Sequence, residues 1–217
     1  MSTEKGGTPL VCHRHCKLSL KVFGVGGAGC NLLVALKSND DLPLIDYRVE
    51  WICIDLGMES LMYAKGSSKV PDDSPIQALS LAPFGSGGRV DLARAAALRH
   101  IEALKALIID AEVVVLLASL GGGTGGGVAP IMSHLARAEG ASVLVTVVTP
   151  FEFEDVRNGM AASAIQLLTR ETDLVVCFSN QELAEGLGDD VLMDVIFAAQ
   201  DRRIAAVISD FLAKRAR

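Results

Sequence analysis

Two kinds of hydrophobic pattern alternate along this chain. Nearly continuous apolar runs rich in Val, Ile and Leu occupy residues 18–25, 48–54, 112–119, 142–149 and 173–179, and a shorter one falls within 71–82. Between them, apolar residues recur at helical spacing, and one helix is predicted over 89–109. Continuous apolarity indicates strands that are buried on both faces. Helices alternating with such strands predict an α/β fold, a Rossmann-like, doubly wound parallel sheet of about six strands with right-handed crossovers.

The two ends of the chain differ from this alternating pattern. Residues 1–17 form a tail of mixed polarity, and residues 18–217 are expected to form one domain. That domain ends in a long helix predicted over 188–217, with Leu192 on its inner face and Ile204 on another side. Because this helix carries more apolar surface than one contact needs, we expect part of it to face a partner or a further domain.

Composition and charge narrow the functional classes. No apolar stretch reaches the roughly 18 residues that a membrane-spanning helix needs, and residues 1–7 lack the apolar core of a signal peptide, so a cytoplasmic protein is expected. The net charge of −6 provides no broad attraction for nucleic acid. Five cysteines, among them Cys53 and Cys177 within apolar strands, indicate reduced core residues rather than disulfides.

A dense group of potential metal ligands lies in the N-terminal tail, formed by Cys12, His13, His15 and Cys16. Such closely spaced ligands can hardly surround a tetrahedral ion, and structural zinc sites normally bring together two separated pairs. We therefore expect a partly ordered terminus here rather than a zinc site.

The strongest chemical signal is a glycine-rich segment at 118–130. An apolar strand ends at Ser119, six glycines surround Thr124, and a helical pattern follows with Pro130 in its first turn. Glycines let backbone N–H groups point toward a ligand, and the start of a helix adds unpaired donors and the positive end of its dipole. The segment therefore predicts a phosphate cradle rather than a flexible linker.

A second glycine turn, at 24–31, joins the first strand to a helix with the spacing G-x-G-x-x-G. This spacing allows a tight turn, close approach of the backbone to a pyrophosphate, and close packing of helix on strand. Asp55 follows the second strand, where a carboxylate could hold a ribose hydroxyl. A nicotinamide or flavin enzyme would use the same acid, so this half of the sequence leaves both classes open.

Other glycine-rich or polar segments follow the remaining strands, at 85–88, at 150–155 and at Asn180. Ligands of a parallel sheet bind outside the carboxyl ends of its strands. We therefore expect these segments, the two glycine turns and Asp55 to lie on one rim.

In their order along the chain, these motifs resemble those of the tubulin/FtsZ superfamily of filament-forming GTPases, from residue 21 to about residue 212. Residues 121–127 match the family's phosphate signature GGGTG[ST]G except at Gly126, and residues 24–31 are similar to its first nucleotide loop except at Cys30. Residues 85–94, 150–154 and 197–201 are similar to the loop beside the terminal phosphate, to PFxFEG and to FGAAND. The shared order is far more specific than any single motif.

The resemblance implies a domain that binds GTP or GDP with Mg²⁺. A carboxylate paired with the N1–H and amino group of guanine discriminates it from adenine. The implied contacts are Gly26, Gly27, Ala28, Gly29, Cys30 and Asn31 at the diphosphate, Gly122, Gly123, Thr124, Gly125 and Gly126 around the phosphates, Gly87 and Gly88 at the terminal phosphate, Glu154 at the ribose, Asn180 and Asp201 at guanine, and Asp55 and Asn158 at further positions of the family's pattern.

Three departures from the family's pattern bear on activity. Gly126 lacks the usual hydroxyl group, and Asn158 occupies the place of an arginine, with Arg157 one position earlier. After the long helix the family has a loop whose acidic residues complete the hydrolytic site of the next subunit, and this sequence stops before it. We therefore expect GTP hydrolysis that is weak alone or completed by a partner, either a second copy or a full-length FtsZ-like homologue, in a cytoskeletal or membrane-remodelling role.

Other nucleotide-dependent classes fit less well. The sequence contains no G-x-x-x-x-G-K-[ST] and no VAIK, HRD or DFG, which argues against P-loop and protein-kinase chemistry. Two alternatives stay open: an NAD- or FAD-dependent Rossmann oxidoreductase that uses residues 24–29 and Asp55, and a structural adaptor of the same fold that binds no nucleotide.

Overall fold

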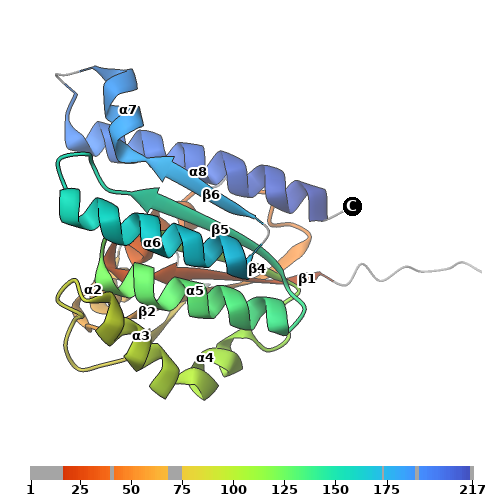
Figure 1. The fold of residues 1–217 in the computed structure, drawn as a ribbon. Helices are drawn as coiled ribbons and strands as arrows, with labels where there is room; N and C mark the ends of the chain where they lie inside the picture. The colour runs from red at the N-terminus through yellow and green to blue at the C-terminus, as the bar shows by residue number, and fades with distance from the viewer. Residues whose placement is uncertain (1–16, 40–41, 68–74, 173, 189–190, 216–217) are drawn as a thin grey trace, which may run out of the picture.

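The protein forms one six-stranded parallel sheet with helices on both faces (Figure 1). The structure is a computed structural model, and it describes residues 17–39, 42–67, 75–172, 174–188 and 191–215. The strand order is β3-β2-β1-β4-β5-β6, which confirms the predicted Rossmann-like, doubly wound α/β fold. The strands are β1 (Leu18–Val25), β2 (Tyr47–Asp55), β3 (Ile76–Ser80), β4 (Val113–Ser119), β5 (Ser142–Thr149) and β6 (Val175–Ser179).

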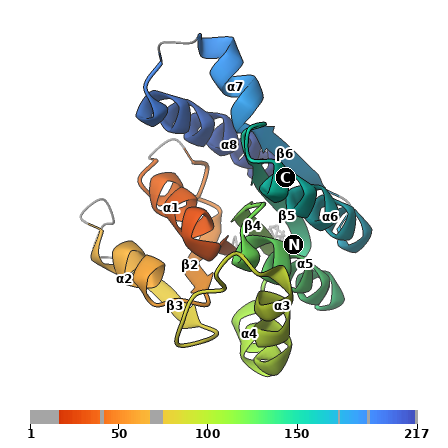
Figure 2. The same ribbon diagram turned by 60° about the vertical axis from the view of Figure 1, so that its left-hand side comes forward.

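The helices form two layers (Figures 1 and 2). One face of the sheet is covered by α3, α4, α5 and α6, and the other by α1, α2 and α8. The sequence pattern had not predicted α2 or α7. The helices are α1 (Gly26–Lys37), α2 (Glu59–Gly66), α3 (Val90–Arg99), α4 (Ile101–Ile108), α5 (Gly123–Ala138), α6 (Asp155–Glu171), α7 (Asn180–Leu187) and α8 (Met193–Arg215).

The central strand β1 shows why the strands are continuously apolar. Phe23 belongs to the core beneath α3–α6, whereas Val22 belongs to the core beneath α1 and α8. Successive side chains of a strand point to opposite faces, so a sheet covered on both sides needs apolar residues at nearly every position. β6 lies at the edge, and there Cys177 is exposed although Cys30 and Cys53 are buried. The prediction of a core cysteine was therefore wrong for Cys177.

The single helix predicted over 89–109 was also wrong, because α3 ends at Arg99 and α4 begins at Ile101. His100 separates them with φ −107° and ψ 23°, and its N–H donates to the carbonyls of Ala96 and Ala97. Its ring Nδ1 lies 2.9 Å from the Ala96 oxygen. The carbonyl of His100 accepts from Leu104 and starts the second helix. Helices α3 and α4 both present their apolar residues to the same core, so hydrophobic periodicity alone did not show that the helix is interrupted at His100.

Helix α5 begins inside the glycine segment, at Gly123. Pro130 is therefore its eighth residue and not part of its first turn, which corrects the prediction. Glycine is a poor helix former, so the sequence pattern placed the helix start after the glycines. A Cβ at Gly127 would lie only 2.7 Å from the Val90 oxygen, and one at Gly125 would overlap the Ser119 oxygen. The helix uses glycine here because its backbone packs directly on β4 and α3.

The long C-terminal helix is present, although α8 begins at Met193 rather than at 188, where Gly188 has φ +100°. Its inner face differs from the predicted one, because Ile204 is buried and Leu192 is 73% exposed. The Cys12–Cys16 group lies outside the described residues. Assignment of residues 1–17 to a tail and 18–217 to a domain stays a prediction.

Candidate functional site

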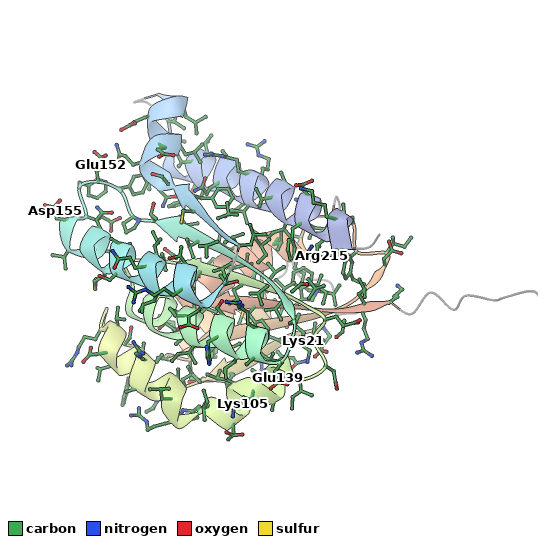
Figure 3. The ribbon with its side chains drawn as sticks, turned by 45° about the vertical axis from the view of Figure 1, so that its right-hand side comes forward. Lys21, Lys105, Glu139, Glu152, Asp155 and Arg215 are labelled. Atoms are coloured by element: carbon green, nitrogen blue, oxygen red, sulfur yellow. The ribbon has the colours of Figure 1, made fainter. Side chains whose placement is uncertain are left out.

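The carboxyl ends of the strands meet at one end of the molecule. Figure 3 shows Glu152 and Asp155, which follow β5, at the opposite end from Lys21 and Glu139. Loops that follow β1, β2, β3 and β4, together with α6, line a cavity of about 320 Å³ there. Its lining residues are Val25, Gly26, Gly27, Ala28, Asp55, Ser60, Gly85, Ser86, Gly88, Ser119, Gly122, Gly123, Thr124, Gly125 and Arg157.

The two predicted glycine turns are in contact at this cavity. Gly26 has φ +78°, and a Cβ on it would lie 3.2 Å from the Gly125 nitrogen and 3.3 Å from the Thr124 Cβ. The loop before α3 closes on the same point, because a Cβ at Gly123 would meet Ser86 and the Arg89 oxygen. Three loops that are far apart in the sequence thus present backbone to one cavity, at the N-terminal end of α5.

Asp55 connects β2 to the start of α5. The residue is 8% exposed, and its Oδ1 accepts hydrogen bonds from the Thr124 hydroxyl and from the Leu56 N–H, both at 2.8 Å. Gly27 lies beside the other oxygen, since a Cβ there would be 3.9 Å from Oδ2. The carboxylate therefore fixes Thr124 and places negative charge on the wall of the cavity.

A second cavity of about 210 Å³ adjoins the first, because Ala28 and Ser119 line both. It lies between α1, the end of β5, the start of α7 and α8. Its lining residues are Ala28, Asn31, Leu32, Ser119, Val148, Asn180, Phe197, Gln200 and Asp201.

Two amide side chains that line the second cavity have buried polar atoms without a hydrogen-bond partner. Gln200 is 2% exposed, and neither its Oε1 nor its Nε2 has a hydrogen-bond partner within the protein. Asn180 Oδ1 is also buried without one. An unsatisfied buried polar atom costs about 1–3 kcal/mol, and most such atoms in proteins are paired. A planar ligand with donors and acceptors on its edge would satisfy these groups.

Most of the predicted nucleotide contacts line one of the two cavities, but six do not: Gly29, Cys30, Gly87, Gly126, Glu154 and Asn158. Gly87 belongs to the loop that lines the larger cavity and has φ +58°. Gly29 packs against β4, where a Cβ would lie 2.5 Å from the Leu117 oxygen. Cys30 points into the core, and its Sγ donates to the Gly24 carbonyl at 3.5 Å.

Gly126 and Asn158 face away from the cavities. A Cβ at Gly126 would contact Val90 at 3.4 Å and Ala164 at 3.6 Å, on the outer side of α5. A hydroxyl side chain at this position would therefore not point into the larger cavity. The Asn158 amide donates to the carbonyls of Phe151 and Glu152 at 2.9 and 3.2 Å, which folds it back onto the loop before α6.

Glu154 is held within the same loop. Its Oε1 accepts from the Phe151 N–H at 3.1 Å, and its Oε2 forms an ion pair with Arg157. Phe151 and Phe153 stack with ring centroids 5.5 Å apart, although Phe153 is 81% exposed. The glutamate thus braces the loop and contacts a neighbouring cation.

Several lining residues were not predicted from the sequence. Ser60 comes from α2, an element without a recognisable pattern, and Ser86 is the serine inside the GSGG turn. Gln200 precedes Asp201, and Arg157 precedes Asn158, so both were adjacent to a predicted position. Gln200 and Asp201 both line the smaller cavity, whereas Arg157 lines the larger one and Asn158 does not.

Within the described residues, no three His, Cys, Asp or Glu side chains gather closely enough to hold a metal ion. In the same part of the chain, no helix combines the length and apolarity needed to cross a membrane.

A doubly wound sheet with glycine turns and a helix N-terminus around a cavity at its carboxyl edge is typical of nucleotide-binding α/β proteins. The sequence model of the Tubulin/FtsZ family, GTPase domain, matches residues 19–188. The chain belongs to this family, which confirms the resemblance inferred from its motifs.

Known relatives agree with this assignment. The chain is 29% identical over 182 residues to the cell division protein FtsZ of Neisseria gonorrhoeae, a match that covers 84% of the chain and 44% of that protein. It is 30% identical over 170 residues to the cell division protein FtsZ 1 of Methanocaldococcus jannaschii, a match that covers 78% of the chain and 44% of that protein. The solved FtsZ dimer of M. jannaschii has a TM-score of 0.74 and 26% identity, covering 90% of the chain and 55% of that structure. The chain therefore spans about half the length of these relatives.

Proposed function

We propose that this protein binds GTP and GDP across the two adjoining cavities, as an FtsZ-like component of a cytoskeletal or membrane-remodelling assembly. The observation that carries the proposal is that Gln200 and Asn180 have buried polar atoms without partners, in a cavity that shares lining residues with the glycine-rich one. The smaller cavity would hold guanine, with Asp201 accepting from its N1–H and amino group. The larger cavity would hold the phosphates at the N-terminus of α5.

The contacts of Asp55 support a mononucleotide over NAD or FAD. In the dinucleotide alternative, the acid after the second strand would hold a ribose. Here Asp55 already holds Thr124 and Leu56 on one oxygen and lines the cavity assigned to phosphates.

The residues present also suit Mg²⁺ bound together with the nucleotide. A polyphosphate beside Asp55 would place like charges together, and Mg²⁺ commonly binds through one or two carboxylates plus substrate phosphates. When bound, Mg²⁺ would neutralise charge on the phosphates. Asp55 and the Thr124 hydroxyl are the candidate groups on the protein side. Removal of Mg²⁺ with EDTA should weaken binding of GTP far more than binding of guanosine.

Hydrolysis is proposed to depend on a second subunit. Asp55 and Arg157 are the ionisable residues among those that line the phosphate cavity, and Asp55 is already engaged with Thr124. Neither side chain is therefore placed as a general base that could take a proton from an attacking water molecule. Three large apolar side chains within four residues of lining positions in the sequence are exposed: Phe84 at 81%, Phe153 at 81% and Met62 at 67%. A covering subunit, either a second copy or a full-length FtsZ-like homologue, would bury them.

Isothermal titration of the purified chain with GTP, GDP, ATP and NAD in the presence of Mg²⁺ tests the proposal. GTP and GDP should bind, and ATP and NAD should bind much more weakly. The variant Gln200→Met keeps the side-chain length but removes the buried amide, so it should unfold no more easily than the unmodified chain while losing guanine nucleotide binding. Absence of any guanine nucleotide binding would refute the proposal and favour the structural adaptor. GTP turnover that appears only after addition of an FtsZ homologue would support completion by a partner.

A further inference from the structure

We infer that Arg157 is the phosphate-binding cation of this protein, in place of the residue at 158 where the family's pattern has its arginine. This inference rests on the proposed nucleotide site. Arg157 lines the phosphate cavity, and Asn158 does not. Consecutive residues of a helix point about 100° apart, and in the first turn of α6 one of these two side chains is directed toward the cavity while the other is held by the preceding loop. The structure assigns that direction to Arg157.

The position of Arg157 is fixed by close packing against the phosphate signature. Gly121 has φ +84°, and a Cβ on it would lie 2.6 Å from Pro150 Cγ and 2.9 Å from the Arg157 Cβ and carbonyl oxygen. Arg157 Nε donates to the Gly121 carbonyl at 3.3 Å. The first glycine of the signature therefore makes room for this particular residue of α6, and the guanidinium is tied to the loop that would surround the phosphates.

Asn158 is committed elsewhere. Its amide nitrogen donates to two carbonyls of the preceding loop, those of Phe151 and Glu152. An arginine in this position would have to leave that loop to reach the cavity. The arginine stands one position earlier in this sequence than in the family's pattern, and α6 is rotated so that this earlier position faces the cavity.

Charge supports the same assignment. Among the residues that line the phosphate cavity, Arg157 is the cation and Asp55 the anion. A polyphosphate placed there would meet one positive side chain, together with the backbone N–H groups of the glycine turns. Arginine binds phosphate through paired N–H donors in a planar fork. Because Nε and one terminal nitrogen are engaged by Gly121 and Glu154, the remaining N–H donors are available for phosphate.

Glu154 then acts as a positioning residue for Arg157. Its carboxylate is braced by the Phe151 N–H and pairs with the guanidinium, whose side chain is 49% exposed while that of Glu154 is 19% exposed. A partly exposed arginine with many rotamers loses entropy when it binds a ligand, and the ion pair restricts it beforehand. Removal of Glu154 should therefore weaken phosphate binding only while Arg157 is present.

The test compares binding of guanosine, GDP and GTP, with Mg²⁺, by the full chain and its variants. Arg157→Gln should leave guanosine affinity unchanged and weaken GTP by about ten- to a hundredfold, as expected for loss of charge-assisted hydrogen bonds. Arg157→Lys should recover part of the loss because it keeps the charge. The matched control Asn158→Ala should change the ratio of GTP to guanosine affinity less than about threefold. In the double variant, Glu154→Gln should add nothing to the effect of Arg157→Gln.

Two different failures can be told apart. If the unmodified chain binds guanosine and GTP but Arg157→Gln keeps the same ratio of affinities, the assignment of Arg157 is overturned and the proposed function stands. A selective loss of GTP in Asn158→Ala would overturn it as well. If the unmodified chain binds none of the three ligands, the proposed function and this inference both fail. Thermal unfolding of each variant shows whether a loss of binding comes from loss of the fold.

Discussion

Adjacent glycines at the start of α5 should respond in opposite ways to the same substitution. A Cβ at Gly125 would lie 3.2 Å from the Ser119 carbonyl carbon and closer still to its oxygen, and neither backbone atom can turn aside. A Cβ at Gly126 would meet Val90 at 3.4 Å and Ala164 at 3.6 Å, which is ordinary van der Waals contact. Gly125→Ala therefore forces α5 away from β4, whereas Gly126→Ala fills space between helices.

The size of the effect follows from two opposing terms. Replacing a helical glycine by alanine is worth about 0.5–1 kcal/mol in favour of the folded state. Overpacking costs about 1–3 kcal/mol, more where only backbone can move. Gly125→Ala should therefore lose about 1–2 kcal/mol net, which lowers the melting temperature of a chain of this length by about 2–8 °C. Gly126→Ala should raise it by about 1–4 °C.

Thermal unfolding followed by circular dichroism, with and without GTP and Mg²⁺, measures both variants. Gly126→Ala should keep the full stabilisation by nucleotide, because position 126 faces away from the phosphate cavity. Gly125→Ala should show less of it, because the shifted turn disturbs the backbone that lines the cavity. If the two variants unfold at the same temperature, or if Gly126→Ala is the less stable one, the close approach of α5 to β4 has been misjudged.

Three further outcomes are expected. Thr124→Val removes a donor from the Asp55 carboxylate and should lower the free energy of unfolding by about 1–3 kcal/mol in urea titrations; an unchanged value would mean that this hydrogen bond is not maintained. The Tyr47 hydroxyl donates to the Leu212 carbonyl at 2.7 Å, and Tyr47→Phe removes this donor. The free energy of unfolding should fall by about 1–3 kcal/mol, and amide hydrogen exchange near the end of α8 should become faster. Unaltered exchange there would contradict this. The pKa of the Cys30 thiol is raised in the folded protein, first by the neighbouring Cys53 thiol and then by burial, so Cys30 stays protonated at a pH where it ionises in the unfolded chain. Stability should therefore be complete below about pH 8.5 and fall at higher pH, with a smaller slope in Cys30→Ala; equal slopes would refute the assignment.

The layered fold was predictable because strands that are buried on both faces must have nearly continuous apolar sequences. A strand covered on both faces, such as β4, needs apolar residues at every position, and six of its seven residues are buried. Crossover helices must alternate with such strands, so the order of segments already implied a parallel sheet. The edge strand β6 lacks that double cover, which is why Cys177 is exposed although its neighbours look like core residues.

Helix boundaries were harder because competing local signals conflict. Glycine has low helix propensity, so the pattern alone placed the start of α5 after its glycines and Pro130 in the first turn. In the structure the helix nevertheless includes these glycines, because Gly125 and Gly127 pack so closely on neighbouring backbone that no larger residue would fit. At His100 the chain breaks between two helices whose apolar positions remain in phase, so no change of period revealed it.

The sequence by itself determined the sheet, the glycine turns and their common rim, because hydrophobic periodicity and backbone freedom are properties of residue type and spacing. Only the tertiary structure decided which neighbouring side chains face the cavities. It directs Arg157 inward and Asn158 back onto its own loop, and it buries both polar ends of Gln200 in the smaller cavity without partners. The physical reason is that side-chain direction depends on how each helix is rotated against the sheet, and many weak contacts distant in the sequence fix that rotation.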